Sequence, residues 1–346
     1  MDLNKIFIKN ACPTKIGGQA ILEGIMMRGA DRTAVAMRRP DGGIHLKVEP
    51  LKKPGNWKKI PIVRGVVAFV DSLVKGTGIL LYSAEVLESF EDPDVQESEE
   101  PDRVTMWLEK HFGEKGALNV MLYSSVVLAI LFTVGVFIVL PTILVNFCKH
   151  YIESDMLLNL VEGGVRILMF VLYIAGISQM KDIKTVFQYH GAEHKTIHCY
   201  ENGLELTPEN AQQFETLHPR CGTSFLMFVI IISWLAHSLL GWPSLFWRIV
   251  SRIVLIPLIA GLSYELLQWA GRSTSPVVKI LSVPGLALQK LSTKRPTTEQ
   301  LEVAIVAMKA VLAEGEPRLY IGETDENGVF VEDPEQEKAE LEKQKK

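Results

Sequence analysis

The sequence predicts a mainly α-helical polytopic membrane protein with about four transmembrane helices and a small α+β N-terminal domain. Hydrophobic residues make up 48% of the 346 residues and charged residues 22%, so apolar and charged side chains must occupy separate stretches. Residues 116–148 contain no Asp, Glu, Lys or Arg, and about 20 apolar residues are enough to span a bilayer as a helix. Short strand-like segments in the first 50 residues predict the α+β part.

Three further segments are apolar enough to complete the predicted set of membrane helices. One of them carries a single acidic residue, Glu265. Another is short and reaches membrane length if Arg166 extends to the lipid interface. The three segments are residues 167–180, 221–247 and 253–271.

Positive charges near the helix ends predict the topology. More Lys and Arg residues lie near the helix ends on the side that holds both termini and the loop 181–223. Because positive charge accumulates on the cytoplasmic side, this side is predicted to be cytoplasmic. Arg248 and Arg252 depart from the pattern, because they lie in a short external loop that should be poor in positive charge. Residues 1–10 lack the long apolar stretch of a signal peptide, so none is expected.

The remaining sequence predicts several smaller elements. Residues 33–37 and 44–48 are expected to pair as a β-hairpin, and residues 60–87 to form a helix that lies on the membrane or in the core. Residues 276–291 predict an interfacial or re-entrant hairpin, because Pro284-Gly285 interrupts them, and residues 298–313 predict an amphipathic helix. The predicted domains are a cytoplasmic α+β domain with an amphipathic helix (1–90), an acidic linker (91–115), a four-helix membrane domain with a metal-motif loop at 181–223 (116–272), and cytoplasmic amphipathic helices with a charged tail (273–346).

The sharpest chemical signal lies in residues 189–198. If this segment is helical, His190 and His194 are one turn apart and project from the same face, so both imidazoles can bind one metal ion. Glu193 directly precedes the second histidine. His-x-x-Glu-His is the inverted form of the zinc-peptidase pattern, in which the glutamate activates the attacking water. The motif therefore predicts a zinc site with Glu193 as general base.

Three other side chains compete for the remaining positions around this metal. His218 and Cys221 precede a predicted membrane helix with His-x-x-Cys spacing, which suits zinc. The alternative is that Cys221 packs at the helix start and His218 is an ordinary loop residue. Glu265 is costly to insert in a bilayer, by about 2.5–3.5 kcal/mol, so it needs a partner or a function. It is either a further ligand or the partner of Arg272 or Arg252 in a buried salt bridge.

All candidate ligands lie at the same ends of the predicted helices, and hence at one membrane face. This convergence favours a metal centre over a scatter of unrelated histidines. The glycine-rich segment 17–29 has no phosphate-loop spacing. Within it, Glu23 and Arg28 either pair with each other or contact the metal centre, and turn or strand-end roles fit them equally well.

Composition excludes several classes of protein. The formal net charge is −4, whereas nucleic-acid binding normally requires a basic domain or stripe. Four cysteines are scattered along a long chain, so a disulfide scaffold is not expected. The high hydrophobic content excludes an intrinsically disordered chain.

Five segments together resemble one family, the YqhQ-like bacterial membrane proteins, a family of unknown function described as predicted metal-dependent enzymes. The resemblance extends over about residues 10–313 and implies a multi-pass protein of the bacterial inner membrane. The segments are residues 17–29, 60–65, 189–195, 218–223 and 301–304. The motif residues that the resemblance implies are His190, Glu193, His194, His218 and Cys221, with the segment 23–28.

These observations lead to two hypotheses about function. The first is a membrane-embedded zinc-dependent hydrolase that cleaves an amide or ester, in a protein or a small molecule, at the cytoplasmic membrane face. Iron or manganese replaces zinc if carboxylates dominate the ligand set. The second is a non-enzymatic assembly factor, scaffold or carrier, in which four protein ligands close a structural metal site. Both hypotheses place the chain in the lipid bilayer, and neither involves nucleic acid.

Overall fold

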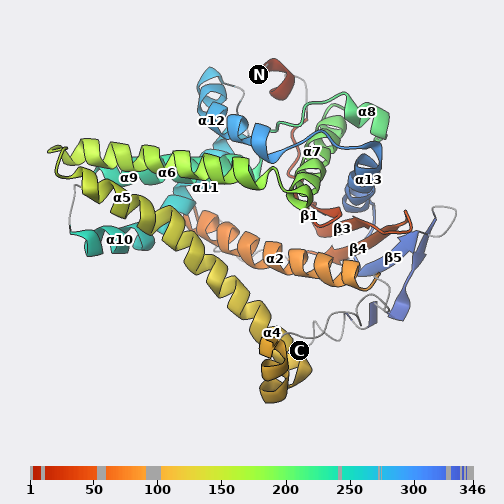
Figure 1. The fold of residues 1–346 in the computed structure, drawn as a ribbon. Coiled ribbons are helices and arrows are strands. Elements are labelled where there is room, and N and C mark those ends of the chain that lie inside the picture. Colours follow the sequence, from red (N-terminus) through yellow and green to blue (C-terminus); the bar gives the residue numbers. More distant parts are fainter. Residues whose placement is uncertain are drawn as a thin grey trace. The chain divides into compact units, whose positions relative to one another are not determined.

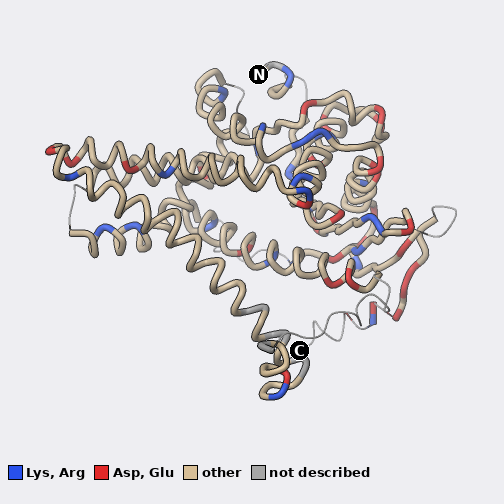
Figure 2. Tube along the Cα trace, viewed as in Figure 1, with Lys and Arg blue, Asp and Glu red and all other residues tan. Residues whose placement is uncertain are grey.

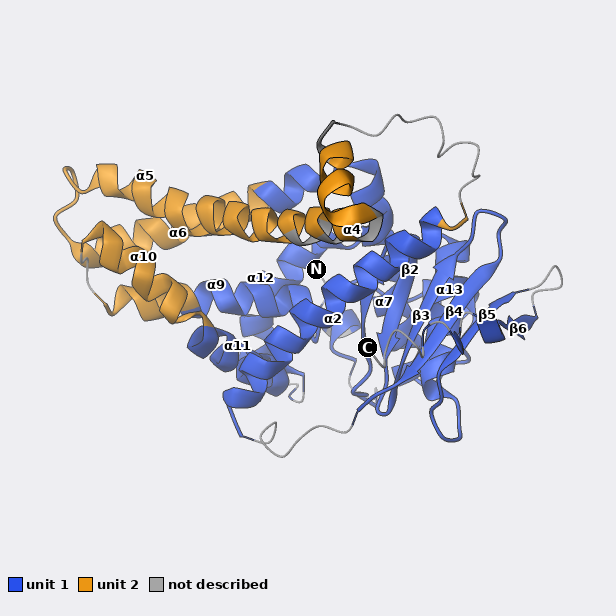
Figure 3. Cartoon of the chain, turned by 90° about the horizontal axis from the view of Figure 1, so that it is seen from below, with its two compact units in different colours: residues 1–88, 173–232, 257–346 blue, residues 89–172, 233–256 orange. Residues whose placement is uncertain are grey.

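The computed structural model divides the chain into two compact units (Figure 1, Figure 3). Unit 1 comprises Met1–Glu88, Tyr173–Ile232 and Pro257–Lys346, and unit 2 comprises Ser89–Leu172 and Ser233–Ile256. The structure describes residues 3–8, 12–52, 60–90, 103–240, 244–271, 273, 275–324, 329–335, 337–338 and 340.

Unit 1 contains an antiparallel sheet built from both ends of the chain. Within the described residues, six strands follow one another in chain order across the sheet. The predicted hairpin is confirmed, because β3 pairs with β4 and Met37 lies opposite His45. Strands β5 and β6 are not among the predicted elements; β5 pairs with β4, with Glu323 opposite His45. The strands are β1 (Gly17–Ile21), β2 (Gly24–Arg28), β3 (Arg32–Arg38), β4 (Ile44–Pro50), β5 (Tyr320–Thr324) and β6 (Phe330–Glu332).

Two helices pack on this sheet and form the core of unit 1. Helix α7 (Lys181–Glu201) contacts β1 and β2, while α13 (Thr298–Leu312) contacts α7, β2, β3 and β4. The apolar face of α13, with Leu301 fully buried, packs inward as expected of an amphipathic helix. Thr297 and Gln300 form a capping box that fixes its start. Two short helices complete this part of the unit, α1 (Leu3–Ile6) and α8 (Pro208–Gln212).

Helix α12 (Pro276–Ser292) corrects one prediction. Instead of a hairpin, the segment is a single helix with Pro284 inside it. A Cβ at Gly285 would lie 2.7 Å from the Ser224 Oγ of α9 (Gly222–Ser238), so the glycine allows a close approach between the two helices. Packing on both sides of the proline therefore maintains the helix despite the lost backbone hydrogen bond.

The long helix α2 (Val63–Glu88) contacts α11 (Ile256–Ala270) at a pair of glycines. A Cβ at Gly65 would lie 2.9 Å from the Gly261 Cα, so the two backbones touch directly. Small residues at such contacts are typical of helices in membranes. Ile62, just before α2, has a φ of 68°, which is strained for a β-branched residue.

In unit 2, several large apolar side chains are exposed and several charged side chains are buried. Leu128 and Leu131 of α4 are exposed, whereas Glu162 of α6 and Arg248 of α10 are buried. Figure 2 shows an uncharged stretch that runs along α4 into α5. This reversal relative to a water-soluble protein is expected of helices that face lipid. The unit contains α4 (Arg103–Val134), η2 (Gly135–Val139), α5 (Leu140–Cys148), α10 (Leu245–Val254) and most of α6 (Asp155–Ile177).

Three of the described helices are long and apolar enough to cross a membrane, namely Val63–Glu88, Ser124–Cys148 and Asp155–Ile177. A fourth is added if the bent pair Leu245–Val254 and Ile256–Ala270 forms one span. Helix α9 is apolar but only 17 residues long. The described chain is thus mainly helical, with three or four candidate membrane spans and a sheet whose first four strands are N-terminal.

The predicted spans agree with these helices in part. The first is helical and apolar as predicted, and the second is longer than predicted because α6 begins at Asp155. Arg166 pairs with Glu162 one turn earlier in the same helix, and its predicted extension to the lipid interface stays a prediction. Helix α2 is a candidate span that the prediction did not include.

The predicted acidic linker is described only in its second half. Residues 91–102 lie outside the described part of the chain, and residues 103–115 belong to α4. The domain boundaries drawn at residues 90, 115 and 272 stay predictions.

Candidate metal centre

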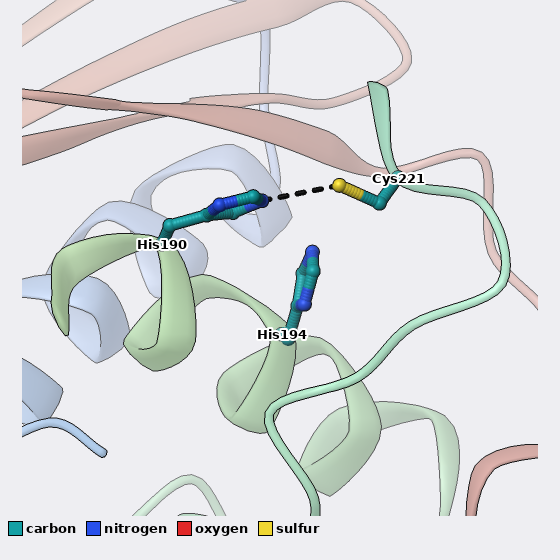
Figure 4. Close-up of side chains that lie close together, drawn as sticks. All are labelled: His190, His194 and Cys221. Atoms are coloured by element: carbon teal, nitrogen blue, oxygen red, sulfur yellow. Dashed lines mark hydrogen bonds between the residues drawn. The ribbon is translucent and has the colours of Figure 1, made fainter. Parts of the chain in front are cut away.

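Three potential metal ligands meet beside α7 (Figure 4). His190 and His194 project from α7 one turn apart, and Cys221 faces them from the segment that leads into α9. Their ligand atoms all lie within 4.8 Å of one another, and the His190 Nε2 is 3.1 Å from the Cys221 Sγ. The structure thus brings together three of the predicted ligands.

Backbone carbonyls fix the orientation of both imidazoles. The His190 Nδ1 lies 2.8 Å from the Ser292 carbonyl oxygen, and the His194 Nδ1 lies 2.5 Å from the Thr216 carbonyl oxygen. Because a carbonyl oxygen only accepts, each Nδ1 carries a proton and donates it. Each Nε2 then keeps a lone pair for a metal, which is how metal-binding histidines are commonly held.

Cys221 is buried in a setting that favours its thiolate form. The Thr223 N–H donates to the Cys221 Sγ over 3.3 Å. Cys221 also directly precedes α9, and the N-terminus of a helix stabilises negative charge. Since the thiolate is the form of cysteine that binds metals, these contacts prepare Cys221 as a ligand.

Glu193 lies beside the three ligands in a buried position. The Gly18 backbone N–H donates to its carboxylate, and a Cβ at position 18 would lie 3.0 Å from the Glu193 Cδ. Burial raises the pKa of Glu193 to about 7, against the opposing effects of the His190 ring and the Gly18 N–H. A carboxyl group with a pKa near neutrality can both accept and return a proton at physiological pH.

His218 lies in a neighbouring polar cluster rather than in the group of three. Its Nε2 is 3.9 Å from the Glu201 carboxylate, which also pairs with the Arg220 guanidinium. The centroid of its ring lies 5.5 Å from that of His194 and 4.7 Å from that of His198. Burial lowers the pKa of His218 to about 3, so the ring is neutral at physiological pH.

Glu265 is not brought to the metal ligands. The Arg64 Nε donates to its carboxylate over 2.7 Å, and the Ile62 N–H donates over 3.2 Å. A salt bridge is thus present, as the alternative interpretation expected, and it joins Glu265 to Arg64; the predicted partner Arg252 pairs with Glu162 instead, and Arg272 lies outside the described residues. The glycine contact between α2 and α11 explains the choice of partner, because it brings Arg64 next to Glu265.

The glycine-rich segment forms β1, β2 and the tight turn between them. Glu23 lies in this turn with a φ of 47°, and its carboxylate is 3.5 Å from the Tyr189 hydroxyl. Arg28 pairs with Asp71 of α2, so Glu23 and Arg28 do not pair with each other. The contact from this segment to the centre comes instead from Gly18.

Comparison with known proteins places the chain in a family. A family model described as "Protein of unknown function (DUF1385)" matches residues 60–314. The chain belongs to the DUF1385 family. A curated relative, "Uncharacterized protein YqhQ" of Bacillus subtilis (strain 168), is 36% identical over 312 residues, which cover 88% of this chain and 94% of the relative. No solved structure gives a significant match.

The DUF1385 match contains the whole ligand group. His190, His194 and Cys221 lie inside it, as do Glu193 and both carbonyl groups that orient the histidines. Gly18 precedes the matched region together with strands β1–β4. The part that matches the DUF1385 model therefore contains the candidate ligands, and the N-terminal sheet contacts Glu193.

Several groups that orient the candidate ligands or lie close to them were not predicted from the sequence. The carbonyl groups of Thr216 and Ser292 belong to the main chain, which is the same in every residue. Residue type therefore gives no signal for their role. Glu201 had a usable signal, because it continues the helical face of His190 and His194 toward the end of α7. That spacing was enough to predict a carboxylate close to the histidines.

The side chains of His190, His194 and Cys221 form a donor set that fits zinc. Two imidazole nitrogens and one thiolate are ordinary zinc ligands, and tetrahedral zinc with three protein ligands keeps a fourth position open. Structural zinc sites, by contrast, are closed by four protein ligands.

Proposed function

We propose that the chain is a membrane-associated, zinc-dependent hydrolase with His190, His194 and Cys221 as metal ligands and Glu193 as general base. The observation that carries the proposal is the convergence of the three ligand atoms within 4.8 Å, with the buried Glu193 carboxylate beside them. Zinc, when bound there, supplies a Lewis acid that polarises the substrate and activates water.

Glu193 carries the proton transfers of the proposed reaction. It accepts a proton from the water whose oxygen attacks the carbonyl carbon of an amide or ester. It then returns that proton to the leaving nitrogen or oxygen as the bond to carbon breaks. The Gly18 N–H holds the carboxylate in place during these transfers.

We also propose that this site lies at the cytoplasmic face of a bacterial inner membrane, with both termini on the same side. Lys181 and Lys184 at the start of α7 support this orientation, because positive charge accumulates on the cytoplasmic side of membrane helices. The curated relative is also bacterial.

Metal content tests the proposal most directly. Protein purified in detergent without chelator should contain about one zinc per chain. His190→Ala and Cys221→Ser should lose the metal, whereas the control His150→Ala, which changes an exposed histidine, should keep it. Inductively coupled plasma mass spectrometry measures all four proteins, and wild-type protein without stoichiometric metal would refute the proposal.

Glu193→Gln separates an enzyme from a scaffold. The amide keeps the shape of the side chain but cannot act as a base, so zinc should stay bound while hydrolysis of an amide and ester panel falls by about 100-fold or more. A cellular complementation assay completes the test. Full complementation by Glu193→Gln would support a structural metal site instead.

A further inference from the structure

Unit 2 holds a buried cluster of arginines around a single carboxylate. The Arg166 Nη2 donates to the Glu162 Oε1 over 2.7 Å, and the Arg252 Nη2 donates to the Glu162 Oε2 over 2.5 Å. Arg248, one turn before Arg252 on α10, donates to the Asn146 Oδ1 over 2.8 Å. We call the three arginines with Glu162 the arginine cluster.

The arginine cluster carries excess positive charge. Arg166 and Arg252 share the single carboxylate of Glu162, so these three side chains carry a formal charge of 2 − 1 = +1. Arg248 is 1% exposed and Arg252 is 5% exposed. Because a buried charge is costly unless an opposite charge balances it, the cluster favours an additional anion.

Several buried donors in this region have no acceptor among the described residues. These donors are the Nε atoms of Arg166 and Arg252 and the Nε1 of Trp234. The indole of Trp234 lies against Gly163, next to Glu162, since a Cβ at Gly163 would overlap the ring. A ligand with several acceptor oxygens would satisfy these donors together with the excess charge.

The arginine cluster lies near one end of the helices of unit 2. Asn146 is two residues before the end of α5, and Arg248 is three residues after the start of α10. Glu162 lies seven residues into α6, which is about 10 Å along its axis. In a bilayer, the ends of spanning helices reach the level of the lipid phosphates.

The outer surface of α10 is consistent with this position. Phe246, Trp247 and Val254 are exposed, while both arginines of the helix point inward. The positive charge that the topology prediction did not expect in an external loop is therefore buried in a helix. The contacts of Arg248 and Arg252 inside unit 2, rather than the orientation of the chain in the membrane, explain where this positive charge lies.

We propose that the arginine cluster binds a phosphate-type oxyanion, which is either the headgroup of an anionic phospholipid or free phosphate. Guanidinium groups suit this ligand because their paired N–H groups match two oxygens of a phosphate. The site is separate from the metal centre and independent of its activity.

Binding can be measured with the full chain in nanodiscs. In one arm, phosphatidylcholine nanodiscs are titrated with inorganic phosphate at constant ionic strength. In the other arm, increasing amounts of phosphatidylglycerol replace phosphatidylcholine. The thermal midpoint reports stabilisation, and native mass spectrometry reports retained lipid. Stabilisation in the first arm identifies free phosphate, and stabilisation in the second arm alone identifies the lipid headgroup.

Three variants make the test specific. Arg252→Lys keeps the charge but loses the paired donors, and Trp234→Phe removes the indole N–H while an aromatic ring, though a smaller one, stays at the position, so each should raise the half-saturating concentration about tenfold. The control Lys149→Met removes an exposed positive charge beyond the end of α5 and should have no effect. No stabilisation in either arm, or equal weakening by Lys149→Met and Arg252→Lys, would overturn the proposal. Trp234→Phe keeps the test decisive if Arg252→Lys does not fold.

Discussion

Glu201 ends the histidine-bearing face of α7 and is held as a carboxylate. Burial by itself raises the pKa of Glu201, but the His218 ring 3.9 Å away and the hydrogen bond and charge of the Arg220 guanidinium lower it to about 2. The folded state therefore binds this proton less readily than the unfolded state. Stability from Glu201 is fully present above its ordinary pKa of 4.5 and is lost as the pH falls from there toward 2.

Glu201→Gln should reduce the stability of the protein at pH 7. It should also make the stability fall less steeply as the pH is lowered. The shift from 4.5 to about 2 corresponds to about 3 kcal/mol at most. His218, which is also buried and neutral, still contributes acid sensitivity, so the variant should have a shallower pH profile rather than a flat one. Thermal midpoints in detergent at pH 7, 5 and 4 measure this. Parallel profiles for wild type and Glu201→Gln would contradict the assignment, and the exposed Glu314→Gln serves as the control.

At the scale of elements, α12 links helix packing to the metal centre. Its glycine contact with α9 and the Ser292 carbonyl at its end both depend on where the helix lies. Gly285→Ala should therefore destabilise the protein by about 1–3 kcal/mol through overpacking and should also lower zinc affinity. Thermal midpoints and a zinc competition assay measure the two effects. Gly176→Ala in α6, which meets open space, is the matched control and should not destabilise.

The elements that local patterns define were predicted correctly. The β3–β4 hairpin has its turn residues between two short apolar strands, and α13 has its cap at Thr297. In α12, Pro284-Gly285 is a local signal for a break, but the contact that decides the outcome is with Ser224 in another helix.

In the candidate site, too, features set by a local pattern were predictable, whereas features set by distant parts of the chain were not. The spacing of His190 and His194 on one helix was sufficient to predict their convergence. Whether His218 or Cys221 joins them depends on the path of the chain between α7 and α9, which no residue pattern encodes. The Arg64 partner of Glu265 is 201 residues away in sequence, so only the fold could identify it.

At the scale of the whole molecule, the sheet of unit 1 depends on the far end of the chain. Strand β5 covers the edge of β4, and Glu340 pairs with Lys47 of β4. Ending the chain after Gly315 removes both contacts and leaves β4 as an exposed edge, which promotes association.

The truncated protein should therefore melt at least about 5 °C lower than wild type and form larger species. Its zinc content should not change, because no ligand or orienting carbonyl is removed. Thermal melting and size-exclusion chromatography with light scattering measure these outcomes, with a chain ending after Glu340 as the control. An unchanged melting temperature and size distribution would show that β5 and β6 contribute little to the fold.

The carbonyl group of Ser292 also sets an order of events during biosynthesis. Ser292 is made 102 residues after His190, which is a delay of about 5–20 s at the usual rate of translation. In the later part of this interval both histidines and Cys221 have been made, but the His190 ring lacks the acceptor that turns its Nε2 toward the sulfur. If these side chains bind zinc as proposed, the nascent chain offers the ion an incomplete site until α12 is made, and metal loading is then expected to follow synthesis of α12.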